Sequence, residues 1–164
     1  MNASIAIQPT GVYNLISSHS VSAQGNWLLE ILSSIRRRLT ESLALGGPLR
    51  DTIDELAEVY LEAVEPGWDG YGAQPISEQV LENAVAFLCR LPQDLPMPDV
   101  SADAQGEIHF EWFSNSYRTL SVSISPAGVL SYAGLFGPNR TRGLELLDGG
   151  IPPSIVSNIR RVFE

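Results

Sequence analysis

The spacing of apolar residues changes along this chain, from helical spacing to strict alternation, near residue 106. Before that point, apolar residues recur every three or four positions, which predicts amphipathic helices at 27–43, 53–64 and 75–91. After it, the segments EIHFEWF, TLSVSIS and VLSYAGLF alternate apolar and polar residues, which predicts half-buried antiparallel strands. A helical half followed by a run of strands is typical of an α+β domain.

The segments after residue 124 refine the expected topology. The turn signal at 125–128 predicts a hairpin, in which Leu130 and Tyr132 face inward if the register pairs Ile124 with Leu130. Residues 143–147 predict a short fourth strand, and the amphipathic segment 154–163, which follows two prolines, predicts a closing helix. We therefore expect an α+β fold in which a helical N-terminal half packs on a three- to four-stranded antiparallel β-meander with a C-terminal helix.

Glycine, proline and short polar residues predict the boundaries of the elements. The second helix is expected to be capped by Asp51 or Thr52, and the third by Ser77. The segment 92–106 contains three prolines and predicts an irregular crossing that ends in a turn at 103–106. The expected organisation is an irregular N-terminal arm, a helical hairpin and an α+β module that forms one compact domain with the hairpin, at 1–23, 24–65 and 66–164.

The charge of the chain limits the classes of partner. It contains 19 acidic residues and ten basic ones, all of them arginine, for a formal net charge of −9. An acidic surface repels phosphate groups, so direct nucleic-acid binding is not expected. The absence of lysine excludes lysine-dependent phosphate loops and Schiff-base chemistry. This composition favours a binding protein over an enzyme.

The single cysteine, Cys89, indicates the redox state of the cellular compartment in which the protein functions. One cysteine cannot form an intrachain disulfide framework, which fits a reducing cytoplasm. No stretch of 18 apolar residues or secretory leader pattern is present, so a cytoplasmic protein without membrane association is expected. Cys89 lies in the apolar run AFLCRL beside Arg90, and we expect it to be a small core or near-core residue rather than a reactive thiolate.

The loop PGWDGYGAQP at 66–75 has the most unusual local sequence. Its glycines allow a sharp bend between two helices, and Trp68 and Tyr71 are expected to pack down and fix the helical half to the sheet. Asp69 is suited to cap a turn. The loop follows a helix and lacks lysine, so it does not match a phosphate-binding loop. The alternative is that Trp68, Asp69 and Tyr71 form part of a recognition surface.

His109 and Glu111 lie two residues apart on a predicted strand, so they share one face with Ser121 and Ser123 of the next strand. A histidine, a carboxylate and hydroxyls resemble an acid–base site. A metal site needs three or four ligands and a hydrolytic triad needs a nucleophile elbow, and the sequence shows neither pattern. We therefore expect no metal, no cofactor and no catalytic residue. The simpler interpretation is a solvated or partner-covered sheet face, with Arg118 paired to a nearby acid.

The second predicted helix has a strongly acidic face. Its carboxylates lie opposite the apolar stripe, at Asp54, Glu55, Glu58, Glu62 and Glu65. If the first two helices form an antiparallel pair, the run Arg36-Arg37-Arg38 is available to pair with these acids.

Several motifs resemble a group of uncharacterised bacterial proteins. They are the GWDGYGA loop and the strand sequences GEI-x-x-EW, LSVSI and G-x-LSYAG. The match covers about residues 66–163 and implies that this part is a recurring module, whereas residues 1–65 are particular to this chain. The resemblance implies no activity. Proteins of this kind are often encoded beside mobile or defence genes, which suggests an accessory role.

The sequence thus predicts a non-catalytic acidic protein that binds another protein, of an accessory, antitoxin-like or immunity-like kind. The expected partner is a basic protein, and self-association is also expected because a short meander exposes a strand edge. Two alternatives stay open: a small enzyme or ligand-binding module that uses the polar sheet face, and a nucleic-acid mimic that uses the acids at 51–65. The candidate interface comprises Trp68, Asp69, Tyr71, His109, Glu111 and Arg118.

Overall fold

The computed structural model describes residues 30, 33 and 47–164. The chain divides into two units, Met1–Ile35 and Arg36–Glu164. In the first unit Glu30 and Ser33 are helical, and the Ser33 hydroxyl donates a hydrogen bond to the Glu30 carbonyl oxygen (2.8 Å). Three predictions lie outside the described residues: the arm at 1–23, the remainder of the helix at 27–43 and the arginine run at 36–38.

The second unit contains three helices among its described residues. They are α2 (Pro48–Ala63), α3 (Glu78–Arg90) and α4 (Pro153–Phe163). α2 begins before the expected cap because Pro48 fits the first helical turn, and the Thr52 hydroxyl donates instead to the Pro48 carbonyl (3.0 Å). α3 begins as expected, with the Ser77 side chain accepting a hydrogen bond from the Val80 amide (3.4 Å). No helix in the described part of the chain has both the length and the apolar character to cross a bilayer.

Five antiparallel strands form one sheet, and each strand pairs with the next in chain order. Ile124 pairs with Leu130, which is the register that directs Leu130 inward, and Leu130 is fully buried. β1 lies at one edge of this meander and β5 at the other. The strands are β1 (Asp99–Ala102), β2 (Ile108–Asn115), β3 (Arg118–Ile124), β4 (Val129–Phe136) and β5 (Asn139–Leu146).

The α+β class is confirmed, but the expected count of three to four strands is wrong. β1 lies within the segment 92–106 that was expected to be irregular; it has four residues and buries only Val100, too few for alternation to be visible in the sequence. β5 begins four residues earlier than expected, because its first outward side chains are Arg140 and Arg142 and give no apolar alternation. Edge strands are partly solvated, so the alternation of apolar and polar residues in their sequence is weak.

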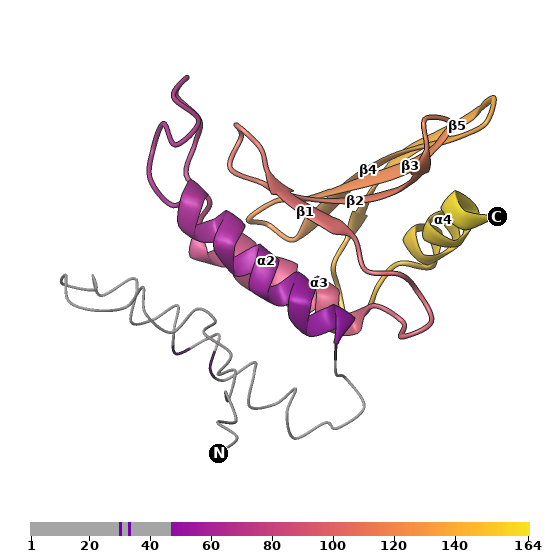
Figure 1. The fold of residues 1–164 in the computed structure, drawn as a ribbon, viewed down its shortest axis with the longest axis horizontal. Coiled ribbons are helices and arrows are strands. Elements are labelled where there is room, and N and C mark those ends of the chain that lie inside the picture. Colours follow the sequence, from indigo (N-terminus) through magenta and orange to yellow (C-terminus); the bar gives the residue numbers. More distant parts are fainter. Residues whose placement is uncertain (1–29, 31–32, 34–46) are drawn as a thin grey trace, which may run out of the picture. The chain divides into compact units, whose positions relative to one another are not determined.

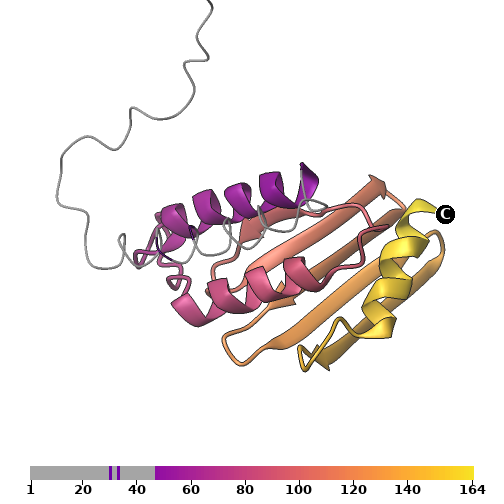
Figure 2. The ribbon, with the colours of Figure 1, turned by 90° about the horizontal axis from the view of Figure 1, so that it is seen from below.

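The three helices lie on one face of the sheet, which gives a two-layer arrangement of the second unit (Figure 1). α2 packs against β1, α3 against β2 and β3, and α4 against β2, β3 and β4 (Figure 2). α2 and α3 precede the sheet in the chain, and α4 follows it, as the closing helix was expected to do.

The core lies between these two layers and depends on the alternation of β2 and β3. Phe110 is fully buried and stacks on Phe87 of α3, with ring centroids 5.1 Å apart. Trp112 is 1% exposed, and its indole N–H donates to the Pro96 carbonyl (2.8 Å). The proline-rich segment before β1 therefore closes one end of the core by accepting a hydrogen bond from a buried aromatic side chain.

Candidate functional site

The sheet face opposite the helices carries most of the polar residues that the sequence singles out. Within the described residues no helix covers this face (Figure 1). Three of its apolar side chains are strongly exposed, Phe113 at 57%, Leu144 at 72% and Leu146 at 64%. We call it the open face and define it by the outward side chains of Asp99, Ser101, His109, Glu111, Phe113, Thr119, Ser121, Ser123, Ser131, Ala133, Leu135, Arg140, Arg142, Leu144 and Leu146.

The register of β2 and β3 confirms that His109 and Glu111 share this face with two serines. His109 lies opposite Ser123, and Glu111 lies opposite Ser121. Their contacts differ, however. The His109 Nε2 atom lies 3.1 Å from the Ser123 hydroxyl, whereas a Glu111 carboxylate oxygen accepts a hydrogen bond from the Thr119 hydroxyl (3.1 Å). The structure therefore places the two residues in separate local environments rather than in one acid–base pair.

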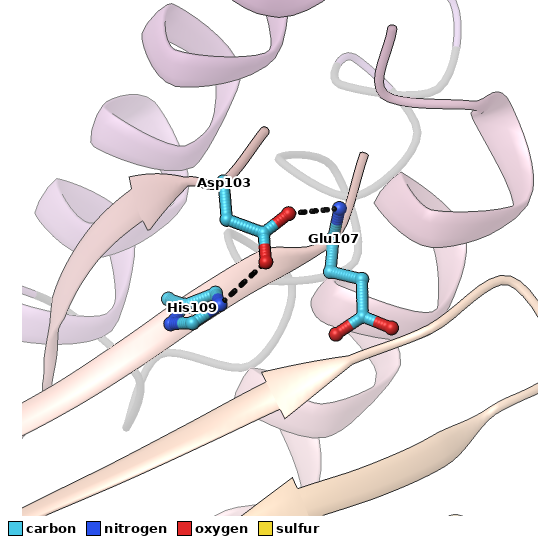
Figure 3. Close-up of side chains that lie close together, drawn as sticks. All are labelled: Asp103, Glu107 and His109. Atoms are coloured by element: carbon cyan, nitrogen blue, oxygen red, sulfur yellow. Dashed lines mark hydrogen bonds and ion pairs between the residues drawn. The ribbon is translucent and has the colours of Figure 1, made fainter. Parts of the chain in front are cut away.

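His109 belongs instead to a cluster at the turn between β1 and β2. One oxygen of the Asp103 carboxylate accepts hydrogen bonds from the Gln105 and Glu107 amides (2.9 and 3.0 Å), which closes the turn. The other oxygen lies 3.0 Å from His109 Nε2. Because Glu107 is two residues before His109, its side chain lies on the same face, and Figure 3 shows the three side chains together. Their donor atoms all lie within 4.8 Å of one another.

The expectation of no metal site rested on the lack of a pattern of three or four ligands in the sequence. It did not consider that the predicted turn at 103–106 folds Asp103 back onto β2. The signal was present as an aspartate that starts a tight turn, followed by the alternating residues Glu107 and His109. Sequence reasoning missed this cluster because it counted ligands along one strand instead of across the hairpin.

The cluster is not a catalytic triad, although it contains an aspartate, a histidine and a serine. In a triad the carboxylate and the hydroxyl bond opposite nitrogens of the imidazole, so that the ring accepts a proton on one side while it is held on the other. Here Asp103 and Ser123 both lie next to the same nitrogen of His109, Nε2. This geometry does not allow Asp103 to orient the ring for proton abstraction from Ser123.

Glu111 lies at one end of a shallow groove of about 660 Å³ on the open face. Arg140 and Arg142 of β5 line it, together with the hydroxyls of Thr119 and Ser121. None of its lining residues is histidine or cysteine, so it has no side chain whose ordinary pKa lies near neutrality. The groove can bind a polar or anionic group by hydrogen bonding, but it offers no general base for neutral pH.

The loop at 66–75 is a bend, as expected. Gly67, Gly70 and Gly72 all have positive φ, at 74°, 78° and 96°. The Trp68 indole donates to the Gln74 carbonyl (3.2 Å) within the loop. The contact from the loop to the β1–β2 turn runs through the backbone, from the Gln74 amide to the Ala104 carbonyl (3.0 Å).

Tyr71 does not pack onto the sheet, and that prediction is wrong. Its side chain is 96% exposed at the tip of the loop. The cause is the turn formed by Asp69, whose carboxylate accepts hydrogen bonds from the Tyr71 and Ala73 amides (2.8 and 3.0 Å). The suggestion that Asp69 caps a turn is therefore confirmed, and a recognition role for the exposed Tyr71 stays a prediction.

We expect Asp69 to make the stability of the loop depend on pH. The amides of Ala73 and Tyr71 stabilise its charged form and lower the pKa of its carboxyl. A lowered pKa in the folded state means that the stabilisation is complete above the unfolded-state pKa of about 3.9 and is lost as the pH falls below it. In Asp69→Asn the amide oxygen still accepts these bonds but does not titrate.

The measurement is the melting temperature of the wild type and of Asp69→Asn between neutral pH and pH 2. The advantage of the wild type is expected to shrink as the solution becomes acidic. A difference between the two proteins that stays constant over this range would contradict the assignment.

Two further sequence expectations are wrong. Arg118 pairs with no acid among the described residues: it lies on the helix side of β3, and its guanidinium donates to the Arg161 carbonyl (2.8 Å) at the C-terminal end of α4. Cys89 has an exposed side chain rather than a core position. Desolvation by the surrounding protein nevertheless raises the pKa of its thiol more than Arg90 lowers it. A raised pKa disfavours the reactive thiolate form.

Comparisons of the chain with protein-family models, with curated proteins and with solved structures gave no match. The resemblance of residues 66–163 to a group of uncharacterised bacterial proteins therefore stays a prediction.

Proposed function

We propose that this protein is a non-catalytic binding protein whose acidic helical surface docks on a basic protein. The distribution of charge over α2 carries the proposal. We define the acidic α2 face as the exposed carboxylates of α2 and of the turn that follows it: Asp51, Asp54, Glu55, Glu58, Glu62 and Glu65. Among the described residues a single ion pair involves these acids, from Arg50 Nε to an Asp54 carboxylate oxygen (3.9 Å).

The charge balance of the described chain supports this choice of surface. Residues 47–164 contain 17 acidic residues and seven arginines. Glu58 and Glu62 are separated by about one helical turn, a rise of about 6 Å, so they present a regular row of negative charge. The open face, by contrast, has Arg140 and Arg142 beside Glu111 and is mixed in sign.

A row of exposed charges acts mainly on the rate and specificity of association. Each exposed ion pair contributes only about 0 to 1 kcal/mol. A field of one sign accelerates encounter with a surface of the opposite sign and repels surfaces of the same sign, and salt screens it. The acidic α2 face therefore suits a partner with a concentrated basic surface and predicts a salt-sensitive complex.

The role that fits this chemistry is an accessory, antitoxin-like or immunity-like protein of the bacterial cytoplasm, in which a small acidic protein neutralises or assists a basic one. The proposal includes membership of the uncharacterised bacterial group. The motifs that carry the resemblance fall on the bend at 66–75 and on β2, β3 and β4.

A nucleic-acid mimic is a second candidate, favoured by the same row of exposed carboxylates. The partner would then be a basic protein whose own nucleic-acid site receives the acidic α2 face. The alternative of an enzyme that uses His109 with Glu111 has no support in the geometry, because these residues contact different partners.

The test is affinity capture from the native host with two variants of equal charge change. Glu58→Gln with Glu62→Gln neutralises two carboxylates of the acidic α2 face. Asp99→Asn with Glu111→Gln neutralises two exposed carboxylates of the open face and is the matched control. We expect the wild type and the control to retain one basic protein at a fixed ratio, released by salt, and the α2 variant to lose most of it.

Two outcomes would overturn the proposal. One is a wild-type protein that elutes without any stoichiometric partner at low salt. The other is a partner that the α2 variant retains as well as the control does. Addition of competing DNA or RNA to the captured complex separates the mimic from an ordinary binding protein, because only a mimic occupies the nucleic-acid site of its partner.

A further inference from the structure

We propose that Asp103, Glu107 and His109 form a binding site for a divalent first-row transition-metal ion. This departs from the sequence-based expectation of no metal site and does not depend on the acidic α2 face. The three residues belong to one hairpin: Asp103 follows β1, Glu107 immediately precedes β2, and His109 is the second residue of β2. Figure 3 shows the Asp103 carboxylate between the other two residues.

The spacing of the donor atoms fits a single ion. Ligands that bind one ion at about 2.1 Å lie about 3.0 to 3.4 Å apart in octahedral or tetrahedral geometry. The free oxygen of Asp103 and Nε2 of His109 are already 3.0 Å apart. The Glu107 carboxylate completes a set within 4.8 Å and makes no hydrogen bond to any described residue, so a change of its side-chain torsions can bring it to the ion.

The backbone holds Asp103 in a fixed orientation before any ion binds. Hydrogen bonds from two backbone amides fix one oxygen of the Asp103 carboxylate and leave the other oxygen directed toward His109. The turn itself is held by Gly106, which has φ 81°, and by the hydrogen bond from Gln74 to Ala104. A preorganised ligand loses little conformational freedom when the ion binds.

The donor set selects the class of ion. One imidazole nitrogen with two carboxylate oxygens suits Zn²⁺ and its neighbours, whereas Ca²⁺ requires six to eight oxygen ligands. The Ser123 hydroxyl, 3.1 Å from Nε2, lies near enough to approach the ion together with water. The side chains of His109 and Asp103 are 31% and 21% exposed, so an ion can enter from the open face.

Binding exchanges one interaction of His109 for another. In the described structure Nε2 faces a carboxylate oxygen of Asp103, and a neutral ring then has its proton on Nε2. The ion takes the Nε2 lone pair, the ring proton is held on Nδ1, and the Asp103 oxygen bonds the ion instead of the ring. The polar groups of Asp103 and His109 therefore have a bonding partner both without the ion and with it.

The experiment is a calorimetric titration of the full chain with Zn²⁺ alone, and with Ca²⁺ as a second ion. Every protein carries Cys89→Ser, because Cys89 is an exposed thiol and cysteine sulfur is a common Zn²⁺ ligand. The variants are Glu107→Gln and His109→Gln. Glu111→Gln is the matched control, since Glu111 lies on the same face of β2 but contacts Thr119.

We expect one saturable Zn²⁺ site, with affinity lowered at least tenfold by Glu107→Gln and by His109→Gln and changed less than twofold by Glu111→Gln. Ca²⁺ is expected to bind at least tenfold more weakly than Zn²⁺. Melting temperatures without ion identify any variant that is unfolded, and the Glu107 variant keeps the Asp103 turn intact. Absence of saturable binding, or binding that both site variants retain, would overturn the proposal.

Discussion

Replacement of Trp112 by alanine is expected to lower the free energy of unfolding by about 3 to 5 kcal/mol. The side chain is 1% exposed and lies at the end of the core, tilted against Phe87 with ring centroids 6.4 Å apart. The variant removes this packing and also leaves the Pro96 carbonyl without the indole donor, which lies 2.8 Å away in the wild type. A loss of this size is a large part of the total stability of about 5 to 15 kcal/mol expected for a domain.

Urea denaturation measures this effect, and the next residue provides the control. Phe113 is 57% exposed on the open face of the same strand, so Phe113→Ala is expected to change the unfolding free energy by less than about 0.5 kcal/mol. Trp112→Phe keeps most of the volume and tests the core if the alanine variant does not fold. Similar losses at positions 112 and 113 would contradict the two-layer arrangement.

Replacement of Gly106 by alanine is expected to lower the free energy of unfolding by about 2 to 4 kcal/mol. Gly106 has φ 81°, which disfavours any residue with a Cβ atom. A Cβ atom at this position would also lie 2.8 Å from the Pro75 carbonyl oxygen, so the loop at 66–75 and the β1–β2 turn would have to separate.

Gly70→Ala separates these two causes. Gly70 has a similar φ of 78°, but a Cβ atom there would have no neighbour within 4 Å. Its replacement is expected to lower the unfolding free energy by only about 1 to 2 kcal/mol, the contribution of backbone strain. The measurement is again urea denaturation, and equal losses at Gly70 and Gly106 would show that the loop and the turn are not closely packed.

The fold was largely accessible from the sequence because most of its elements have one buried and one solvated face. α3, β2, β3 and β4 alternate or repeat with a clear period, and the hairpin of β3 and β4 followed from a four-residue turn. β1 was missed because it is short and borders two prolines, and the start of β5 because an edge strand needs few apolar residues. Periodicity detects burial, so it is weakest where an element is only partly buried.

The candidate site was less accessible because it depends on distances across the chain. The sequence placed His109 and Glu111 on one face correctly, yet it could not show that the turn directs Asp103 toward His109. It also placed Arg118 with the polar residues, although the parity of β3 directs its side chain toward α4. Tyr71 was expected to pack down onto the sheet, but its amide bonds the Asp69 carboxylate and its side chain is exposed at the tip of the loop.

We propose that the acidic α2 face, and not the open face of the sheet, contacts the partner. Carboxyl-group footprinting of the captured complex tests it most directly, since a carbodiimide with an amine label modifies only exposed acids. The account predicts that labelling of Glu58 and Glu62 falls several-fold in the complex, whereas labelling of Asp99 and Glu111 is unchanged, all four being exposed in the free protein. Protection of Asp99 and Glu111 with undiminished labelling of α2 would contradict it.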